Sequence, residues 1–152
     1  MKKPSLPLLA SLFLLLALLL PPPLQARTIS ARVTRVVDGD TVVIAGGERV
    51  RYVGIDTPER GQPFFREAKR RNASLVRART VRLEICDAEP RDRYGRLLAF
   101  VYAGGVFVNR ALVSEGLARR LIIPPCGLPV SREFQDLERG ARQRGRGIWK
   151  GK

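Results

Sequence analysis

Alternation of apolar and polar side chains is the clearest pattern in the first half of the chain. Residues 29–34 alternate strictly, with the two-residue period of a half-buried strand. The turn sequence Asp38-Gly39 separates them from a β-branched run at 41–44, and Gly46-Gly47 precedes a third β-rich run at 50–55. The pattern predicts a hairpin extended to a three-stranded meander.

Two further β-rich runs follow in the second half of the chain. Residues 81–86 alternate apolar and polar side chains, and residues 97–102 form a fifth run. We expect this last strand to continue at 106–108 after a turn at Ala103-Gly104-Gly105. Five strands are therefore predicted.

Three segments carry helical signals. Residues 65–79 are good helix formers with a sparse apolar stripe. Asn109 is predicted to cap the start of a second helix that ends near Gly116. Ser131 is predicted to cap a third helix, which ends before Gly145 and whose apolar positions have helical spacing.

The order of these elements decides the fold class. Three strands, a helix, two strands and two helices leave no strand-helix-strand alternation, so a doubly wound parallel sheet is excluded. We expect an α+β, mainly antiparallel domain, namely a five-stranded β-barrel of the OB type with three α-helices. About 120 residues suffice for such a barrel to build one core.

Residues 1–26 have the composition of a secretory signal peptide. Lys2 and Lys3 precede an apolar run at 8–20, and three prolines follow it. An uncleaved anchor is the alternative, but these 13 residues fall short of the ~20 that span a bilayer. We expect a mature domain at 27–152 that is exported to the periplasm or the medium without stable membrane association.

Charge narrows the range of partners. Lysine and arginine number 28 against 14 acidic residues, a formal net charge of +14, and all but five of these cations are arginine. Arginine's planar fork matches phosphate oxygens, so nucleic acids, acidic glycans and anionic membranes are the candidate partners. The chain has no histidine, which excludes imidazole bases, Ser-His-Asp triads and histidine-ligated metals.

Acidic residues follow two of the predicted strands. Asp38-Gly39-Asp40 and Asp56-Thr57-Pro58-Glu59 lie where ends of the meander could converge. Such acids are commonly turn residues. In so basic a chain, however, clustered carboxylates also suggest a bound cation, and oxygen ligands select Ca²⁺ or Mg²⁺.

Together with Arg51 and Asp92-Arg93-Tyr94-Gly95-Arg96, these motifs resemble the staphylococcal nuclease (thermonuclease) family in order and approximate spacing. The resemblance extends from about Ile29 to Trp149. A lone Asp-Gly-Asp is a weak signal, but three separated motifs in one order are specific.

The resemblance implies a Ca²⁺ ion held by the carboxylates of Asp40 and Asp56 and by the backbone carbonyl of Thr57. Asp38 is expected to serve as a turn residue beside this site.

The resemblance also assigns the reacting groups. Glu59 is expected to activate the attacking water, which in a chain without histidine falls to a carboxylate. Arg51 and Arg96 correspond to the two catalytic arginines that bind the phosphate and stabilise the transition state. Arg93 and Tyr94 match residues that bind the substrate's terminal phosphate. The family has lysine at the position of Arg93, so the charge is kept and the geometry is altered.

Two cysteines suggest a covalent link. Export would place Cys86 and Cys126 in an oxidising compartment, which favours one disulfide, with two buried thiols as the alternative. Cys126 ends the segment 121–126, where the family places tyrosines that form a nucleotide-base pocket. A disulfide there would clamp the outer wall of that pocket.

The resemblance implies a Ca²⁺-dependent nuclease that hydrolyses DNA and RNA with little sequence preference and leaves 3′-phosphorylated products. We expect a monomer that needs no protein partner. A noncatalytic nucleic-acid-binding barrel is one alternative, but it would not require the acids and the two arginines together. A cationic envelope protein that binds lipid or glycan is another, and it leaves the acids unexplained.

Overall fold

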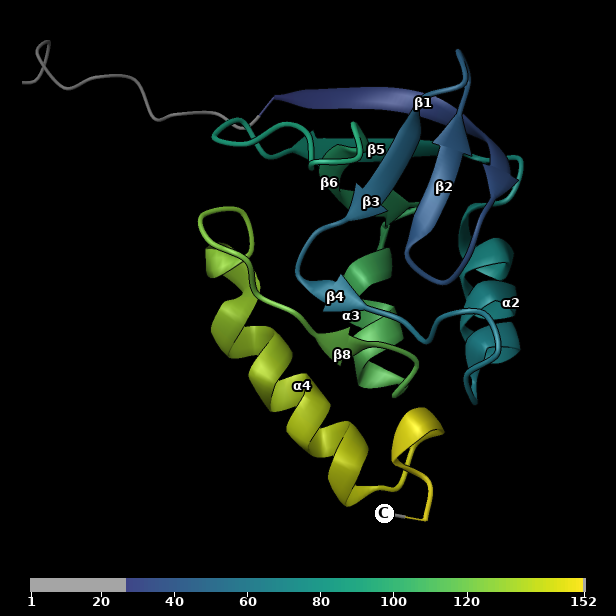
Figure 1. Cartoon of the computed structure of the whole chain (residues 1–152), viewed down its shortest axis with the longest axis vertical. Coiled ribbons are helices and arrows are strands. Elements are labelled where there is room, and N and C mark those ends of the chain that lie inside the picture. The colour runs from purple at the N-terminus through teal and green to yellow at the C-terminus, as the bar shows by residue number, and fades with distance from the viewer. Residues whose placement is uncertain (1–26, 152) are drawn as a thin grey trace, which may run out of the picture.

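The computed structural model describes residues 27–151 and contains eight strands and three α-helices in that range (Figure 1). The strands are β1 (Thr28–Val36), β2 (Thr41–Ile44), β3 (Arg49–Tyr52), β4 (Ile55–Asp56), β5 (Thr80–Ile85), β6 (Leu97–Ala103), β7 (Val106–Phe107) and β8 (Arg119–Arg120). The helices are α2 (Phe65–Val76), α3 (Val108–Ser114) and α4 (Ser131–Gln143), with 3₁₀ turns η1 (Leu128–Val130) and η2 (Gly147–Trp149).

Five of the strands close into a barrel. β1 pairs antiparallel with β2 and with β5, β2 with β3, and β5 with β6. β3 then pairs parallel with β6, which completes the ring. The predicted OB-type α+β fold is confirmed, and this parallel contact is the one departure from antiparallel pairing within the ring.

A register shift in β1 lets one long strand serve both halves of the barrel. Residues 28–32 pair with β5, and the pairing with β2 begins at Val33. The shift falls between Val33 and Arg35, where an irregularity bends the strand. The barrel can therefore close around a core of fully buried valine, leucine and isoleucine side chains.

The three α-helices of the described region pack around the barrel, two beneath the strands and one beside them (Figure 1). Figure 1 shows α3 and α4 beneath the strands and α2 beside them. α3 is buried through Val108, Leu112 and Val113, and α4 adds Phe134 to the same core. α3 and α4, both from the second half of the chain, thus pack against the barrel core.

The third β-rich run is divided, contrary to the prediction of one strand at 50–55. Gly54 has φ of +81°, and a Cβ there would come within 3.2 Å of Val130 and Phe134. The chain therefore turns between β3 and β4. β4 pairs with β8, a short strand that the sequence pattern did not predict.

Helix boundaries also differ from the prediction. α2 ends at Val76, three residues early, and Ala78 has φ of +57°. Asn109 is not a cap, because the helix begins at Val108 and the buried Asn109 amide bonds the main chain of Val101 and Val53 instead. Ser131 is likewise the first helical residue and makes no capping bond.

The predicted signal peptide lies outside the described residues. None of the helices within residues 27–151 is long and apolar enough to cross a bilayer.

Candidate active site

Arg51 connects the two acids predicted to bind metal. Its Nη2 donates to Asp56 Oδ1 at 3.2 Å, and its Nη1 lies 3.5 Å from Asp40 Oδ2. The same Nη1 donates to the carbonyl oxygens of Tyr52 and Ile55 at 2.7 and 2.8 Å. The turn between β3 and β4 therefore fixes the guanidinium in place between the two carboxylates.

Asp40 is held by the start of the second acidic motif. Its Oδ2 accepts hydrogen bonds from the backbone N–H and the hydroxyl of Thr57, at 2.8 and 3.0 Å. Both residues are buried. A Cβ at Gly39 would lie 2.7 Å from the Thr57 side chain, so only glycine there lets the two motifs approach this closely.

Asp38 supports the turn as predicted. Its Oδ1 accepts from the backbone N–H of Asp40, and its carbonyl accepts from the Asn72 amide on α2. The Asn72 Oδ1 in turn accepts from the buried Tyr52 hydroxyl. Burial and the neighbouring Asp40 charge raise the pKa of Asp38 to about 6.

The donor set fits a hard cation. Burial first, and then the charge of Asp40, raise the pKa of Asp56, although Arg51 and Arg119 oppose this shift. A cation beside both carboxylates would relieve this penalty, and their oxygen atoms suit Ca²⁺ or Mg²⁺. Within residues 27–151 no three acidic or cysteine side chains cluster as metal ligands, so backbone oxygen and water would have to complete the shell.

Arg96 is oriented by an acid that the prediction did not assign. Asp92 Oδ2 accepts from Arg96 Nε at 2.7 Å, and Asp92 Oδ1 accepts from the backbone N–H groups of Tyr94 and Arg96. The four-residue spacing between Asp92 and Arg96 could have predicted this ion pair from the sequence. The Arg96 guanidinium also lies 5.3 Å from the centre of the Tyr94 ring.

A pocket of about 500 Å³ brings the predicted basic residues together, and we call it the arginine pocket. Arg51, Arg96, Arg93 and Tyr94 line it. Arg93 Nη2 donates to the Tyr94 hydroxyl at 2.6 Å, and the Tyr94 side chain is 65% exposed. Two predicted catalytic arginines and the two predicted substrate-binding residues therefore share one concave surface.

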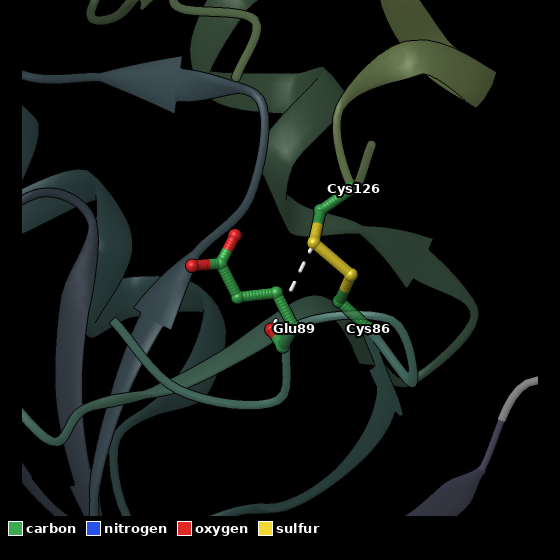
Figure 2. The surroundings of a disulfide bond; sticks show 3 residues. All are labelled: Cys86, Glu89 and Cys126. Carbon is green, nitrogen blue, oxygen red and sulfur yellow. Dashed lines mark hydrogen bonds between the residues drawn. A yellow bond between two sulfur atoms is a disulfide. The ribbon is translucent and has the colours of Figure 1, made fainter. Parts of the chain in front are cut away.

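A disulfide holds the outer wall of the arginine pocket. Cys86 follows β5, and its sulfur is bonded to that of Cys126, with the two Cα atoms 5.5 Å apart (Figure 2). The predicted disulfide is confirmed. Glu89 contacts the bridge through its carbonyl oxygen, 3.8 Å from the Cys126 sulfur. Leu121 and Ile123, both exposed, line the pocket on the segment that this bridge restrains.

Among residues 27–151, Glu59 forms no side-chain hydrogen bond or ion pair with the other predicted site residues. It is exposed on the loop between β4 and α2, where its backbone N–H donates to Gln62 Oε1 at 2.8 Å. Among residues 27–151 its carboxylate has no hydrogen-bond or ion-pair partner. The side chain is therefore available to solvent, three residues after Asp56.

Comparison with known proteins gives one family. Residues 49–151 match the family model described as "Staphylococcal nuclease homologue". Endonuclease YncB of Bacillus subtilis (strain 168) is 36% identical over 134 residues, 82% of this chain and 64% of the relative. A thermonuclease of Staphylococcus intermedius is 43% identical over 102 residues, 61% of this chain and 60% of the relative.

A micrococcal nuclease of Shigella flexneri is 36% identical over 130 residues, which cover 77% of this chain and 71% of that protein. The alignments with YncB and with the thermonuclease of Staphylococcus intermedius each span less than two thirds of the relative's length. The matched family region begins at β3, after the segment that carries Asp38 and Asp40.

Proposed function

The chain belongs to the staphylococcal nuclease family, and from that premise we propose that it is a Ca²⁺-dependent phosphodiesterase that hydrolyses DNA and RNA. The observation that carries the proposal is the contact of Arg51 with both Asp40 and Asp56. It brings a phosphate-binding cation and two hard-metal ligands to one point.

The metal would be held by Asp40, Asp56 and the Thr57 carbonyl. A bound Ca²⁺ supplies positive charge for the oxygen atoms of the phosphate that is cleaved. Thr57 and Thr41 keep the Asp40 carboxylate in place through hydrogen bonds. The acids are thereby preorganised before substrate arrives.

The arginines bind and polarise the phosphate. Arg51 is fixed by two carbonyl oxygens, and Arg96 by Asp92, so neither guanidinium has to be ordered when charge develops in the transition state. Each retains N–H groups for forked hydrogen bonds to nonbridging oxygens. Arg93 and Tyr94 then bind the next phosphate at the rim of the arginine pocket.

Glu59 takes the proton of the attacking water, or orients that water. Its exposed carboxylate is free to turn toward a phosphate bound at Arg51, and no histidine is present to perform this step. Cleavage on the 5′-oxygen side leaves a 3′-phosphate on one product and a free hydroxyl on the other.

Little sequence preference is expected, because phosphate contacts carry no base information. Binding should weaken steeply as salt rises, and single strands should be favoured because their bases can turn into the pocket. We further propose that the domain acts as an exported monomer, after removal of residues 1–26, without a protein partner.

The test is hydrolysis of end-labelled single-stranded DNA, double-stranded DNA and RNA with Ca²⁺. All three should be cut, single strands fastest, and the labelled fragments should carry 3′-phosphates. Fragments with 3′-hydroxyl ends would contradict the proposed direction of cleavage. Binding without cleavage would favour the noncatalytic barrel.

A further inference from the structure

A second pocket, of about 590 Å³, adjoins the proposed metal ligands. Asp56 and Thr57 line it, together with the loop before α2 and the C-terminal residues Ile148 and Lys150. Arg119, on β8, completes its wall. We call it the C-terminal pocket, and it shares no lining residue with the arginine pocket.

The two pockets are linked through the Arg51–Asp56 hydrogen bond. Arg51 lines the arginine pocket, Asp56 lines the C-terminal pocket, and these side chains are hydrogen-bonded at 3.2 Å. A phosphate bound at Arg51 therefore lies at the boundary between two concave surfaces. A chain longer than one nucleotide that fills the arginine pocket can continue into the C-terminal pocket.

We propose that the C-terminal pocket is a second polynucleotide subsite, in which Arg119 and Lys150 bind a backbone phosphate adjacent to the one that is cleaved. This inference rests on the proposed function and extends it, since it assigns substrate contacts outside the arginine pocket. The ligand is the phosphate of a DNA or RNA strand.

The charges of the C-terminal pocket favour a phosphate. Neither Arg119 nor Lys150 forms an ion pair with any residue of 27–151, whereas Arg96 is paired with Asp92 and Arg71 with Glu115. Arg119 lies opposite Asp56 in the β4–β8 register. The charge of Arg119 also acts on the Asp56 carboxylate, but neither cation has to break a salt bridge within residues 27–151 before it binds a polyanion.

The Arg119 side chain is oriented by its contact with the Trp149 ring. Its guanidinium lies 4.9 Å from the centre of the Trp149 ring, and that ring is buried beneath Arg142 as well. Stacking on an aromatic ring reduces the freedom that the side chain loses on binding. Phe64 and Ile148 supply apolar lining, which suits the sugar of the same nucleotide.

The experiment compares a dinucleotide with a single-stranded octanucleotide of the same base, bound in chelator so that neither is cut. The dinucleotide has one phosphodiester, so it cannot place one phosphate at Arg51 and a second at Arg119 and Lys150. Wild type is measured with Arg119→Gln, Lys150→Gln and the double variant. Arg32→Gln is the charge-matched control, because Arg32 is exposed on β1 and lines neither pocket.

We expect each pocket variant to weaken octanucleotide binding by roughly three- to ten-fold and dinucleotide binding by less than two-fold. The salt dependence for the octanucleotide should lose roughly 0.7 from its logarithmic slope for each cation removed. Arg119→Lys should restore most of the affinity, and Lys150→Gln keeps the test valid if Arg119→Gln fails to fold.

Equal losses for both ligands, or no loss beyond that of Arg32→Gln, would overturn the subsite. So would a wild type that binds the octanucleotide no more tightly than the dinucleotide. If wild type failed to cleave the octanucleotide when Ca²⁺ replaced the chelator, the proposed nuclease function itself would fail, whatever the binding measurements showed. The two failures are thus distinguishable.

Discussion

Arg51 donates to Asp56 Oδ1 at 3.2 Å while its other terminal nitrogen is held by two main-chain carbonyl oxygens. The main-chain bonds set the direction of the guanidinium, and the aspartate contact ties it to the proposed metal site. The turn between β3 and β4 therefore fixes both the position of the Arg51 guanidinium and its distance from Asp56.

Replacing Arg51 by lysine should lower kcat by roughly 10²- to 10³-fold, because one ammonium group cannot satisfy two carbonyl oxygens and also bind a phosphate in a fork. The measurement is steady-state cleavage of single-stranded DNA at saturating Ca²⁺. Arg32→Lys is the control and should leave kcat unchanged. Equal rates for Arg51→Lys and wild type would remove Arg51 from the mechanism.

Glu59→Gln should reduce kcat strongly, by roughly 10²-fold or more, while DNA binding in chelator stays close to that of wild type. The reason is that glutamine keeps the size of the side chain but cannot accept the proton of water. Glu67→Gln, on the exposed first turn of α2, is a matched control. A Glu59→Gln enzyme with wild-type turnover would show that another group activates the water.

Asp92→Asn should lower kcat by roughly ten- to a hundred-fold, because Arg96 loses its charged partner and its fixed direction. Burial alone would raise the pKa of Asp92, but hydrogen bonds from the Arg96 main chain and side chain and from the Tyr94 N–H outweigh it and lower that pKa below its ordinary 3.8. A lowered folded-state pKa contributes stability above pH 3.8, and this stability is lost as pH falls through the folded value.

The pH dependence separates this positioning role from a general loss of structure. The difference in thermal midpoint between wild type and Asp92→Asn should be largest near neutral pH and should shrink below about pH 4. A difference that stays constant from pH 7 to pH 3 would contradict the ionised Asp92–Arg96 pair. Asp136→Asn, in an exposed pair on α4, is expected to change little at either pH.

The Cys86–Cys126 disulfide should matter for both stability and substrate binding. Its removal in Cys86→Ser/Cys126→Ser should cost roughly 3–4 kcal/mol of unfolding free energy, since the bridge closes a long loop. KM should rise more than kcat falls, because the bridge restrains the wall with Leu121 and Ile123 rather than a reacting group. A double variant with unchanged KM would show that the wall does not touch substrate. Thiol titration of the denatured wild type should find no free thiol.

Local signals predicted the barrel because its strands carry their own alternation and turns. Residues 41–44 and 81–85 needed no knowledge of their partners. The break at Gly54 was missed because it depends on Val130 and Phe134, which approach from distant parts of the chain. β8 was missed because two arginines give no periodic pattern, and pairing with β4 alone makes them a strand.

In the site, too, local sequence patterns indicated some residues, and others depend on contacts between distant parts of the chain. Asp40 and Arg51 lie close because β2 and β3 are adjacent in the meander, whereas Asp56 reaches Arg51 only through the turn between β3 and β4. The role of Asn109 was predicted wrongly, because a capping preference is local whereas its amide satisfies main-chain groups of β6 and of the turn after β3. Arg119 and Lys150 carried no motif, and only the folded chain brings them beside Asp56 and Thr57.

The proposed metal-dependent nuclease activity is tested most directly by cleavage of single-stranded DNA in parallel reactions with Ca²⁺, with Mg²⁺ and with chelator. Cleavage should occur only in the Ca²⁺ reaction, and it should be lost in Asp40→Asn and Asp56→Asn. Equal cleavage in chelator would contradict the metal site. Tight, salt-sensitive binding without cleavage in any reaction would instead contradict the nuclease and identify a noncatalytic nucleic-acid-binding barrel.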